Sequence, residues 1–182
     1  MAYNHAMEMR LAEALRCLSR TPAVLRALLE GLPEQWVETS EEEWTIREVV
    51  GHLIHGERTD WVPRIRIILA HGESRPFDPF DMTGHFDVIA GRSLDKLLDE
   101  FQQMREANVR EVEALSLQPA DLERTGMHPA LGPMTLGEYI AAWAVHDWTH
   151  INQTTRILAG HYANACGPLR QYMGVFRGRT AG

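Results

Sequence analysis

Residues 135–160 read TLGEYIAAWAVHDWTHINQTTRILAG, and this stretch decides the fold class. Its apolar residues recur with a period of about 3.6, which is typical of an amphipathic helix. Thr135 is followed three residues later by Glu138, the spacing of a capping box, and Gly160 is a typical helix stop. We therefore expect a helix over 135–159 that buries one face against other helices.

Two histidines lie four residues apart in this helix, within His146-Asp147-Trp148-Thr149-His150. Positions i and i+4 are neighbours on a helix surface, with Cβ atoms roughly 5–6 Å apart. Two imidazoles on adjacent turns can therefore bind one metal ion at ~2.0–2.1 Å. Helical counting places both at or inside the core-facing side, with Gln153 on the same flank. The alternative is a pair of hydrogen-bonded histidines, because this spacing also arises by chance.

The rest of the chain predicts three more amphipathic helices, over 6–30, 45–70 and 93–115. Thr45, followed three residues later by Glu48, is the expected cap of the second helix, and Ser93 is the expected cap of the third. Thr21-Pro22 should kink or restart the first of them, and Pro63 should bend the second. No stretch shows the alternation that is typical of a strand. Four amphipathic helices favour an all-α fold, a four-helix bundle in a single domain over 1–182.

The segments between and after these helices are irregular. Two long loops, 71–91 and 116–134, are rich in turn-forming residues. A short helix is expected near 168–175, followed by a flexible tail over about 176–182. If the bundle has an open cleft, we expect these two loops to line its entrance.

The composition excludes several classes of protein. Lys and Arg number 18 against 25 Asp and Glu, whereas binding to nucleic acid or to an anionic membrane surface needs clustered cations. Cys17 and Cys166 form no CxxC pair, which argues against a disulfide framework or a cysteine zinc site. No uncharged apolar run approaches the ~20 residues of a membrane helix, and the first residues lack a signal-peptide pattern. We expect a cytoplasmic protein that acts on a small molecule.

A third metal ligand has to come from another helix, and the second helix offers His52 and His55. The apolar stripe of that helix puts His52 on a flank and His55 further toward solvent, so His52 is the better candidate. A surface position for His52 is the alternative. In the first long loop, His71 and His85 are expected to be exposed, and the alternative is that they face the opening of the metal site.

Three carboxylates, Glu57, Asp60 and Asp147, fall on apolar stripes, where an ionised acid needs a partner. Pairing with an arginine would make them struts between helices. The candidate arginines include Arg10, Arg16, Arg47 and Arg105. The alternative is that one acid orients a metal-bound histidine or moves a proton. Glu57, about one turn beyond His52, is the first candidate for that catalytic role.

Two segments resemble signatures of one family. Residues 44–53, WTIREVVGHL, resemble the second-helix signature of the DinB/YfiT-like superfamily of metal-binding four-helix bundles. Residues 146–153, HDWTHINQ, resemble its fourth-helix signature. Further familial segments follow in order along nearly the whole chain: Pro76-Phe77-Asp78, Arg105 with Asn108, His128-Pro129, Leu131-Gly132, Thr135-Leu136 and residues 167–172.

The resemblance implies one divalent metal ion bound by three histidines, which by motif are His52, His146 and His150. Nickel or zinc is the expected ion, and manganese or iron would also suit the site. Three ligands leave positions open for water or substrate, as in a catalytic metal site. Residues expected to support the ligands or line the pocket are Asp147, Gln153 and His128. Apolar residues on the flanks of the bundle are also compatible with a homodimer.

Two reactions compete as the function. The family includes thiol-dependent transferases and isomerases that use bacillithiol, mycothiol or glutathione, and other members are described as metal-dependent hydrolases. A metal can lower the pKa of a low-molecular-weight thiol for attack on an electrophile, or activate water for attack on a carbonyl. We expect thiol transfer or isomerisation ahead of hydrolysis. A metal- or ligand-binding bundle without catalysis is the third interpretation.

Overall fold

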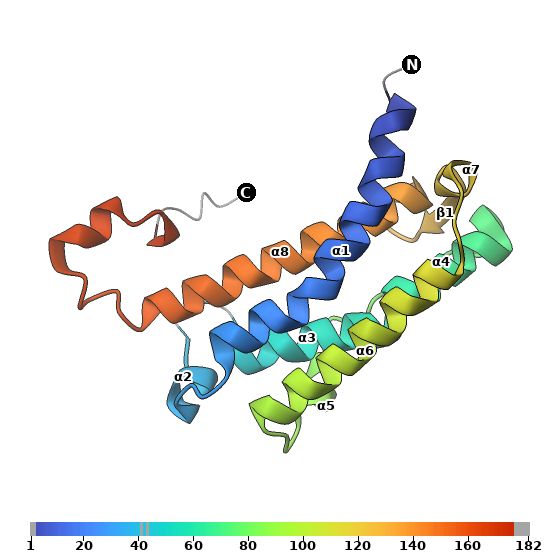
Figure 1. Cartoon of the computed structure of the whole chain (residues 1–182). Coiled ribbons are helices and arrows are strands. Elements are labelled where there is room, and N and C mark those ends of the chain that lie inside the picture. The colour runs from blue at the N-terminus through green and yellow to red at the C-terminus, as the bar shows by residue number, and fades with distance from the viewer. Residues whose placement is uncertain (1–2, 41, 43, 177–182) are drawn as a thin grey trace.

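The computed structural model describes residues 3–40, 42 and 44–176, with side chains from residue 11 onward. Its long helices are α1 (Tyr3–Leu29), α3 (Ile46–Thr59), α4 (Trp61–His71), α6 (Leu94–Ala114) and α8 (Leu136–Gly160). Helix α1 packs against α6 and α8, and α3 also packs against α6 and α8, with α4 extending α3 (Figure 1). This arrangement is the predicted four-helix bundle. Within the described ranges, no helix has the length and apolar character needed to cross a bilayer.

Short elements connect and extend the bundle. Three are short α-helices: α2 (Glu34–Glu38), α5 (His85–Ile89) and α7 (Pro119–Leu122). Three are 3-10 helices: η1 (Gly72–Ser74), η2 (Gly167–Tyr172) and η3 (Gly174–Phe176). The helix expected near 168–175 is thus a pair of 3-10 turns, which lie on a segment beyond the end of α8 (Figure 1). Its last turn, η3, packs back on α8. Most of the tail expected to be flexible, residues 177–182, lies outside the described residues.

Three of the long helices begin at the residues that the sequence predicts. The hydroxyl groups of Thr45 and Thr135 accept hydrogen bonds from the backbone N–H groups of Glu48 and Glu138. The carboxylate of each glutamate accepts a hydrogen bond from the backbone N–H of its threonine. Ser93 caps α6 in the same way through the N–H of Lys96. Each cap satisfies one N–H that the first helical turn leaves without a partner.

The second helix breaks earlier than expected. A single helix over 45–70 bent at Pro63 was the prediction, but α3 ends at Thr59 and α4 begins at Trp61, with Asp60 between them. Pro63 has no N–H for the carbonyl of Thr59 and its ring crowds that carbonyl, so the break falls one turn before the proline. Helix α1, in contrast, continues through Pro22 as one element.

The loop over 116–134 contains a β-hairpin that the sequence did not predict. Strand β1 (Thr125–His128) pairs antiparallel with β2 (Gly132–Thr135). Each strand has only four residues, too few to show an alternating pattern. Gly132 has a φ of +80°, in the left-handed region that glycine adopts readily, and it lets the chain reverse directly into β2.

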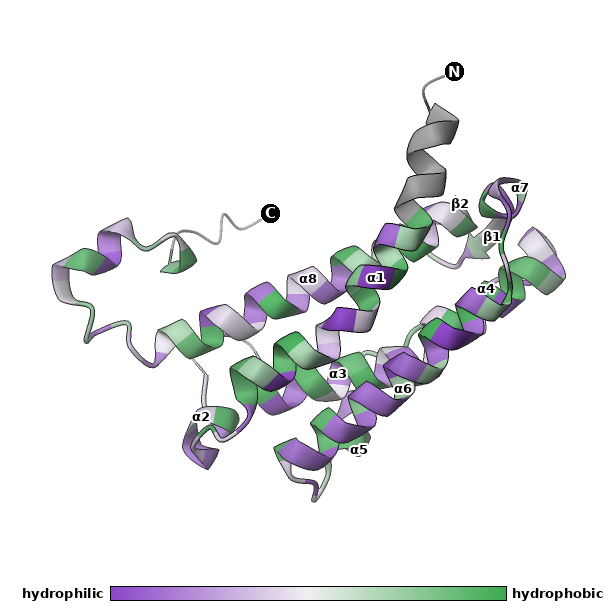
Figure 2. Cartoon of the chain, viewed as in Figure 1, coloured by the Kyte–Doolittle hydropathy of each residue, from purple (hydrophilic) through white to green (hydrophobic). Residues whose placement is uncertain are grey.

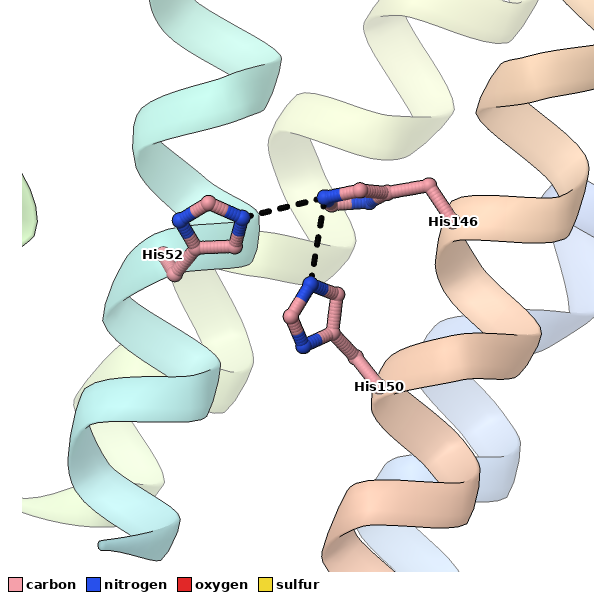
Figure 3. A group of neighbouring side chains, drawn as sticks. All are labelled: His52, His146 and His150. Carbon is pink, nitrogen blue, oxygen red and sulfur yellow. Dashed lines mark hydrogen bonds between the residues drawn. The ribbon is translucent and has the colours of Figure 1, made fainter. Parts of the chain in front are cut away.

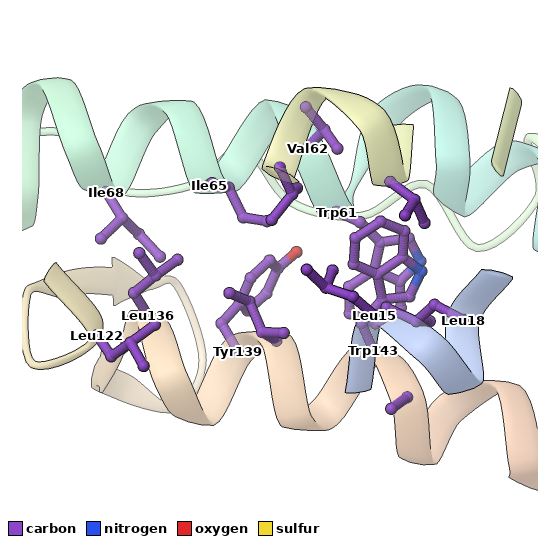
Figure 4. Close-up of a cluster of buried hydrophobic side chains, with 14 of the residues drawn as sticks. Leu15, Leu18, Trp61, Val62, Ile65, Ile68, Leu122, Leu136, Tyr139 and Trp143 are labelled. Atoms are coloured by element: carbon purple, nitrogen blue, oxygen red, sulfur yellow. The ribbon is translucent and has the colours of Figure 1, made fainter. Parts of the chain in front are cut away.

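The interior holds two apolar clusters, one toward each end of the bundle. The first gathers around Trp61 and Trp143 (Figure 4). The second gathers around Phe101, with Leu25 and Ile157. Hydrophilic residues cover the outward side of α6 (Figure 2). Helices α1, α6 and α8 contribute to both clusters, whereas α4 contributes only to the first and α3 only to the second. The residues between the clusters therefore set how the helices align.

Arg105 lies between the two clusters and is fully buried. Its guanidinium donates hydrogen bonds to Glu57 Oε1 at 2.8 Å, to both carboxylate oxygens of Asp147, and to the carbonyl of Leu18 at 2.9 Å. Burial opposes the charge, but the two carboxylates outweigh it and raise the pKa of Arg105. Helices α1, α3, α6 and α8 are therefore joined through one side chain.

Pro22 explains why the Leu18 carbonyl is available. In an unbroken helix this carbonyl would accept the N–H of residue 22, which proline lacks. Arg105 supplies the missing donor from another helix. The proline that the sequence predicts to disturb α1 thus leaves a carbonyl free to bind Arg105. We call Arg105, Glu57 and Asp147 the central ion cluster.

Replacing Arg105 with Leu should lower the free energy of unfolding by about 3–5 kcal/mol, because two carboxylates would remain buried without a counter-ion. Urea unfolding followed by circular dichroism measures this loss. The control is Arg110→Leu on the same helix, where a solvent-exposed pair with Glu106 should contribute less than about 0.5 kcal/mol. A loss below about 1 kcal/mol for Arg105→Leu would contradict the central role of this cluster.

Candidate metal centre

Three histidines converge from two helices of the bundle. His52 projects from α3, and His146 and His150 project from successive turns of α8 (Figure 3). The Nε2 atom of His146 lies 3.0 Å from Nε2 of His52 and 3.1 Å from Nε2 of His150. One ligand atom from each residue lies within 4.8 Å of the others. The structure thus brings together the three histidines that the family resemblance assigns to the metal.

Hydrogen bonding between the rings does not account well for this geometry. Nε2 of His146 offers either one N–H or one lone pair, yet it faces a ring nitrogen on both sides. A cation among the three nitrogens would receive a lone pair from each of them. Two nitrogens bound to one ion at ~2.0–2.1 Å lie roughly 2.9–3.4 Å apart, which fits the two observed separations.

The local environment keeps these rings neutral. Burial, reinforced by electrostatic repulsion between the ring and His150, lowers the pKa of both His52 and His146 to about 3. Burial also lowers the pKa of His150. Desolvation disfavours the imidazolium form, so the rings keep the lone pairs that metal binding requires at neutral pH.

Gln153 orients one of the ligands. Its side-chain oxygen lies 2.8 Å from Nδ1 of His150 and accepts the N–H there. With the proton on Nδ1, the Nε2 atom of His150 carries its lone pair toward the other two histidines. Such a partner on the far side of a ligating histidine fixes its tautomer and ring angle. The sequence placed Gln153 on the flank of His150, and the structure gives it this contact.

Aromatic rings enclose the three histidines. The ring centroid of Trp44 lies 4.9 Å from that of His52 and 5.9 Å from that of His150, where the two rings are parallel. Trp61 stands edge-on to His146 at 5.1 Å. These contacts restrict water at the ring faces and hold the rings in place. Within the described part of the chain, no fourth histidine, cysteine or carboxylate joins this group.

Of the three candidate acids, Glu57 and Asp147 belong to the ion cluster around Arg105, whereas Asp60 pairs with Arg64. Glu57 accepts hydrogen bonds from Arg105, from Asn108 at 2.9 Å and from Trp143 at 3.0 Å, so both of its carboxylate oxygens have partners. Asp147 is paired with Arg105. This geometry favours the interpretation of both acids as struts between helices over a catalytic role for Glu57.

His128 lies in the hairpin rather than in the three-histidine group. Its Nδ1 accepts the backbone N–H groups of Ala130 and Leu131 at 3.1 Å, which stabilises the turn between β1 and β2. Its ring stands edge-on to Phe77, with centroids 6.2 Å apart. The structure therefore shows His128 supporting a loop beside the bundle.

His85 was expected to be exposed and is buried, so that expectation was wrong, and His55 is buried as well, although it is slightly more exposed than His52. His55 is 9% exposed and His85 is 2% exposed. Helix α5 begins at His85 and packs on α3, and this packing buries both histidines. Glycines at positions 51 and 84 allow that approach, but glycine in a helix or loop is too common to predict it.

Comparisons with known proteins were consistent with this architecture. A protein of Oceanobacillus iheyensis, named as a candidate metal-dependent hydrolase, is 24% identical over 140 residues, covering 75% of this chain and 78% of the relative. The solved structure of YfiT from Bacillus subtilis, described as a probable metal-dependent hydrolase with an unusual four-helix bundle topology, superimposes with a TM-score of 0.69 at 19% identity. That likeness covers 86% of this chain and 87% of YfiT and shows a shared fold.

The family model of the DinB superfamily matches residues 18–154, a range that includes the whole three-histidine group. The match spans more than half of the chain. The protein is therefore a member of the DinB superfamily.

Proposed function

We propose that this protein binds one divalent metal ion through His52, His146 and His150 and is a metal-dependent hydrolase of a small molecule. The observation that carries the proposal is the convergence of three neutral ring nitrogens on one point. Three protein ligands leave coordination positions open, as catalytic sites do. The names of the two relatives support hydrolysis as the reaction.

The residues of this chain have separate roles in the proposed site. A divalent ion bound there would act as a Lewis acid and lower the pKa of water. His52, His146 and His150 would bind the ion, and Gln153 would keep the proton of His150 on Nδ1. Arg105, Glu57 and Asp147 would act as positioning residues, because they fix the spacing between α3 and α8.

The expected thiol chemistry stays a prediction. Both relatives are named for hydrolysis, so we propose hydrolysis as the reaction in preference to thiol transfer. The two reactions require the same metal site and differ in whether a low-molecular-weight thiol is consumed.

The purified protein should hold about one nickel, zinc or manganese ion per chain after reconstitution, because three imidazoles suit each of them. Single substitutions His52→Ala, His146→Ala and His150→Ala should each weaken metal affinity by about 100-fold or more, since a ligand is lost. Elemental analysis and chelator competition measure these changes, with folding checked by circular dichroism. The exposed His71 provides the control, His71→Ala. A wild-type protein that binds none of the three ions would refute the proposal.

Replacing Gln153 with Leu should weaken metal affinity by about 10- to 100-fold, because His150 would lose the partner that fixes its tautomer. Chelator competition again gives the affinity. Gln102→Leu on α6 is the matched control, since Gln102 bonds Glu106 on the surface of the bundle. Equal affinities for the two variants would show that the Gln153 contact does not orient the ligand.

The metal-loaded protein should hydrolyse members of a panel of activated esters and amides without added thiol, and His146→Ala should reduce turnover to the background rate. Product release measured by absorbance checks this, with glutathione, bacillithiol or mycothiol and an electrophilic haloarene tested in parallel. Turnover that occurs only when a thiol is present would instead assign the site to thiol transfer.

A further inference from the structure

His85 is a buried histidine that has no polar partner. It is 2% exposed, and neither Nδ1 nor Nε2 has a hydrogen-bond partner among the described residues. A neutral imidazole always carries one N–H and one lone pair, and leaving both unpaired in a protein interior opposes folding. A phenylalanine or leucine would fill the same space without that penalty. The ring is therefore better explained by a binding role than by packing.

The fold places His85 beside the candidate metal centre through close backbone contacts. A Cβ atom at Gly51 would collide with the side chain of Ile89 and lie 3.2 Å from the carbonyl oxygen of His85. A Cβ atom at Gly84 would lie 2.6 Å from Nε2 of His55. Glycine at both positions lets α5 lie directly on α3, and the ring centroid of His85 then lies 6.3 Å from that of His52.

His55 lies beside His85 and has a similar unpaired nitrogen. Its Nε2 atom is also buried without a partner, and so is Nδ1 of His52. Three imidazoles thus present unpaired nitrogens in one region, next to the point where the three-histidine group converges. Such a concentration of unpaired groups is unusual, because buried polar atoms in folded proteins nearly always have partners.

Two aromatic rings cover this region and are not held in helices. Trp44 lies 5.1 Å from His85 between ring centroids, and Phe80 lies 5.0 Å from His55. Trp44 is in a bend before the cap of α3, and Phe80 is in the loop before α5. Both are partly exposed and lie outside the helices, so a movement of these two rings would open the region without moving the helices.

We propose that His85, with His55 beside it, forms the wall of the substrate site that hydrogen-bonds the oxygen of an uncharged carbonyl group, as in an ester or amide. This inference rests on the proposed function, because the carbonyl must also reach the metal centre. The buried cations of the described chain, Arg64 and Arg105, are already paired with Asp60, Glu57 and Asp147. The site therefore offers imidazole N–H groups to a ligand rather than a free positive charge.

The test uses cobalt(II)-loaded protein titrated with acetohydroxamate, which binds metal ions through its carbonyl and N–O oxygens. Its carbonyl oxygen would therefore lie at the metal and could also accept a hydrogen bond from the wall. The visible spectrum of the cobalt ion reports binding of the probe. His85→Phe should weaken probe binding about tenfold, the factor that corresponds to one lost hydrogen bond. Its affinity for cobalt should change less than about twofold, since the three ligands remain. His85→Gln keeps a donor and should restore most of the binding.

His161→Phe is the matched control, because His161 stacks on Trp36 and also has an unpaired nitrogen in the described structure. This variant should bind the probe as the wild type does. If His85→Phe binds acetohydroxamate with wild-type affinity, the proposed hydrogen bond from His85 is refuted, and the proposed metal site is unaffected. If the wild-type protein binds no cobalt, the proposed function and this inference both fail.

Melting temperatures of the metal-free proteins provide a second measurement. A histidine kept for binding leaves its nitrogens unpaired, so His85→Phe should melt at the wild-type temperature or above it. A drop of several degrees in both His85→Phe and His85→Gln would show that the ring is structural and would overturn the proposal.

Discussion

The buried guanidinium of Arg105 is the constraint on which the arrangement of this bundle depends. It reaches a backbone carbonyl of α1 and carboxylates on α3 and α8 from its own position on α6. An apolar interior alone would allow these helices to slide past one another, because apolar contacts are not directional. Directional, charge-assisted hydrogen bonds fix one register. Asp147 follows His146 directly, so the register of the ion cluster is also the register of the metal centre.

This dependence explains why a costly feature lies at the centre of the protein. Burying one cation and two anions brings little net stability compared with apolar residues of similar size. The three-histidine group nevertheless requires Nε2 atoms from α3 and α8 to lie about 3 Å apart. An ion cluster joining the same two helices holds that spacing more tightly than side-chain packing would. Stability is given up for precision at a site that needs it.

The sequence predicted the features that are local and missed those that depend on packing between distant segments. The caps at Thr45 and Thr135 follow from a glutamate three residues later, and the cap at Ser93 follows from its residue type; all three were confirmed. Pro63 predicted a bend, but the helix instead breaks at Asp60, because the proline ring crowds the carbonyl of Thr59 one turn earlier. The hairpin was missed because its strands are short.

The same distinction applies to the site. The spacing of His146 and His150 is a helical property and could be read directly from the sequence. The burial of His55 and His85 could not be predicted in this way, because it depends on α5. This five-residue helix packs on α3 where Gly51 and Gly84 leave room. The sequence also indicated that the buried acids need arginine partners. It did not single out Arg105 among the candidates, since the choice depends on how four helices meet.

The structure separates the part of the site that would hold a metal from the part that would meet a substrate. The three histidines project from long helices whose spacing is fixed by the central ion cluster. Trp44, Phe80 and His85 lie on short segments packed over those helices. Changes in the covering segments can therefore alter the shape and hydrogen bonding around a substrate while the spacing of the histidines stays the same. A bundle built this way could support different reactions at one candidate metal centre, so membership in the superfamily does not by itself identify the substrate.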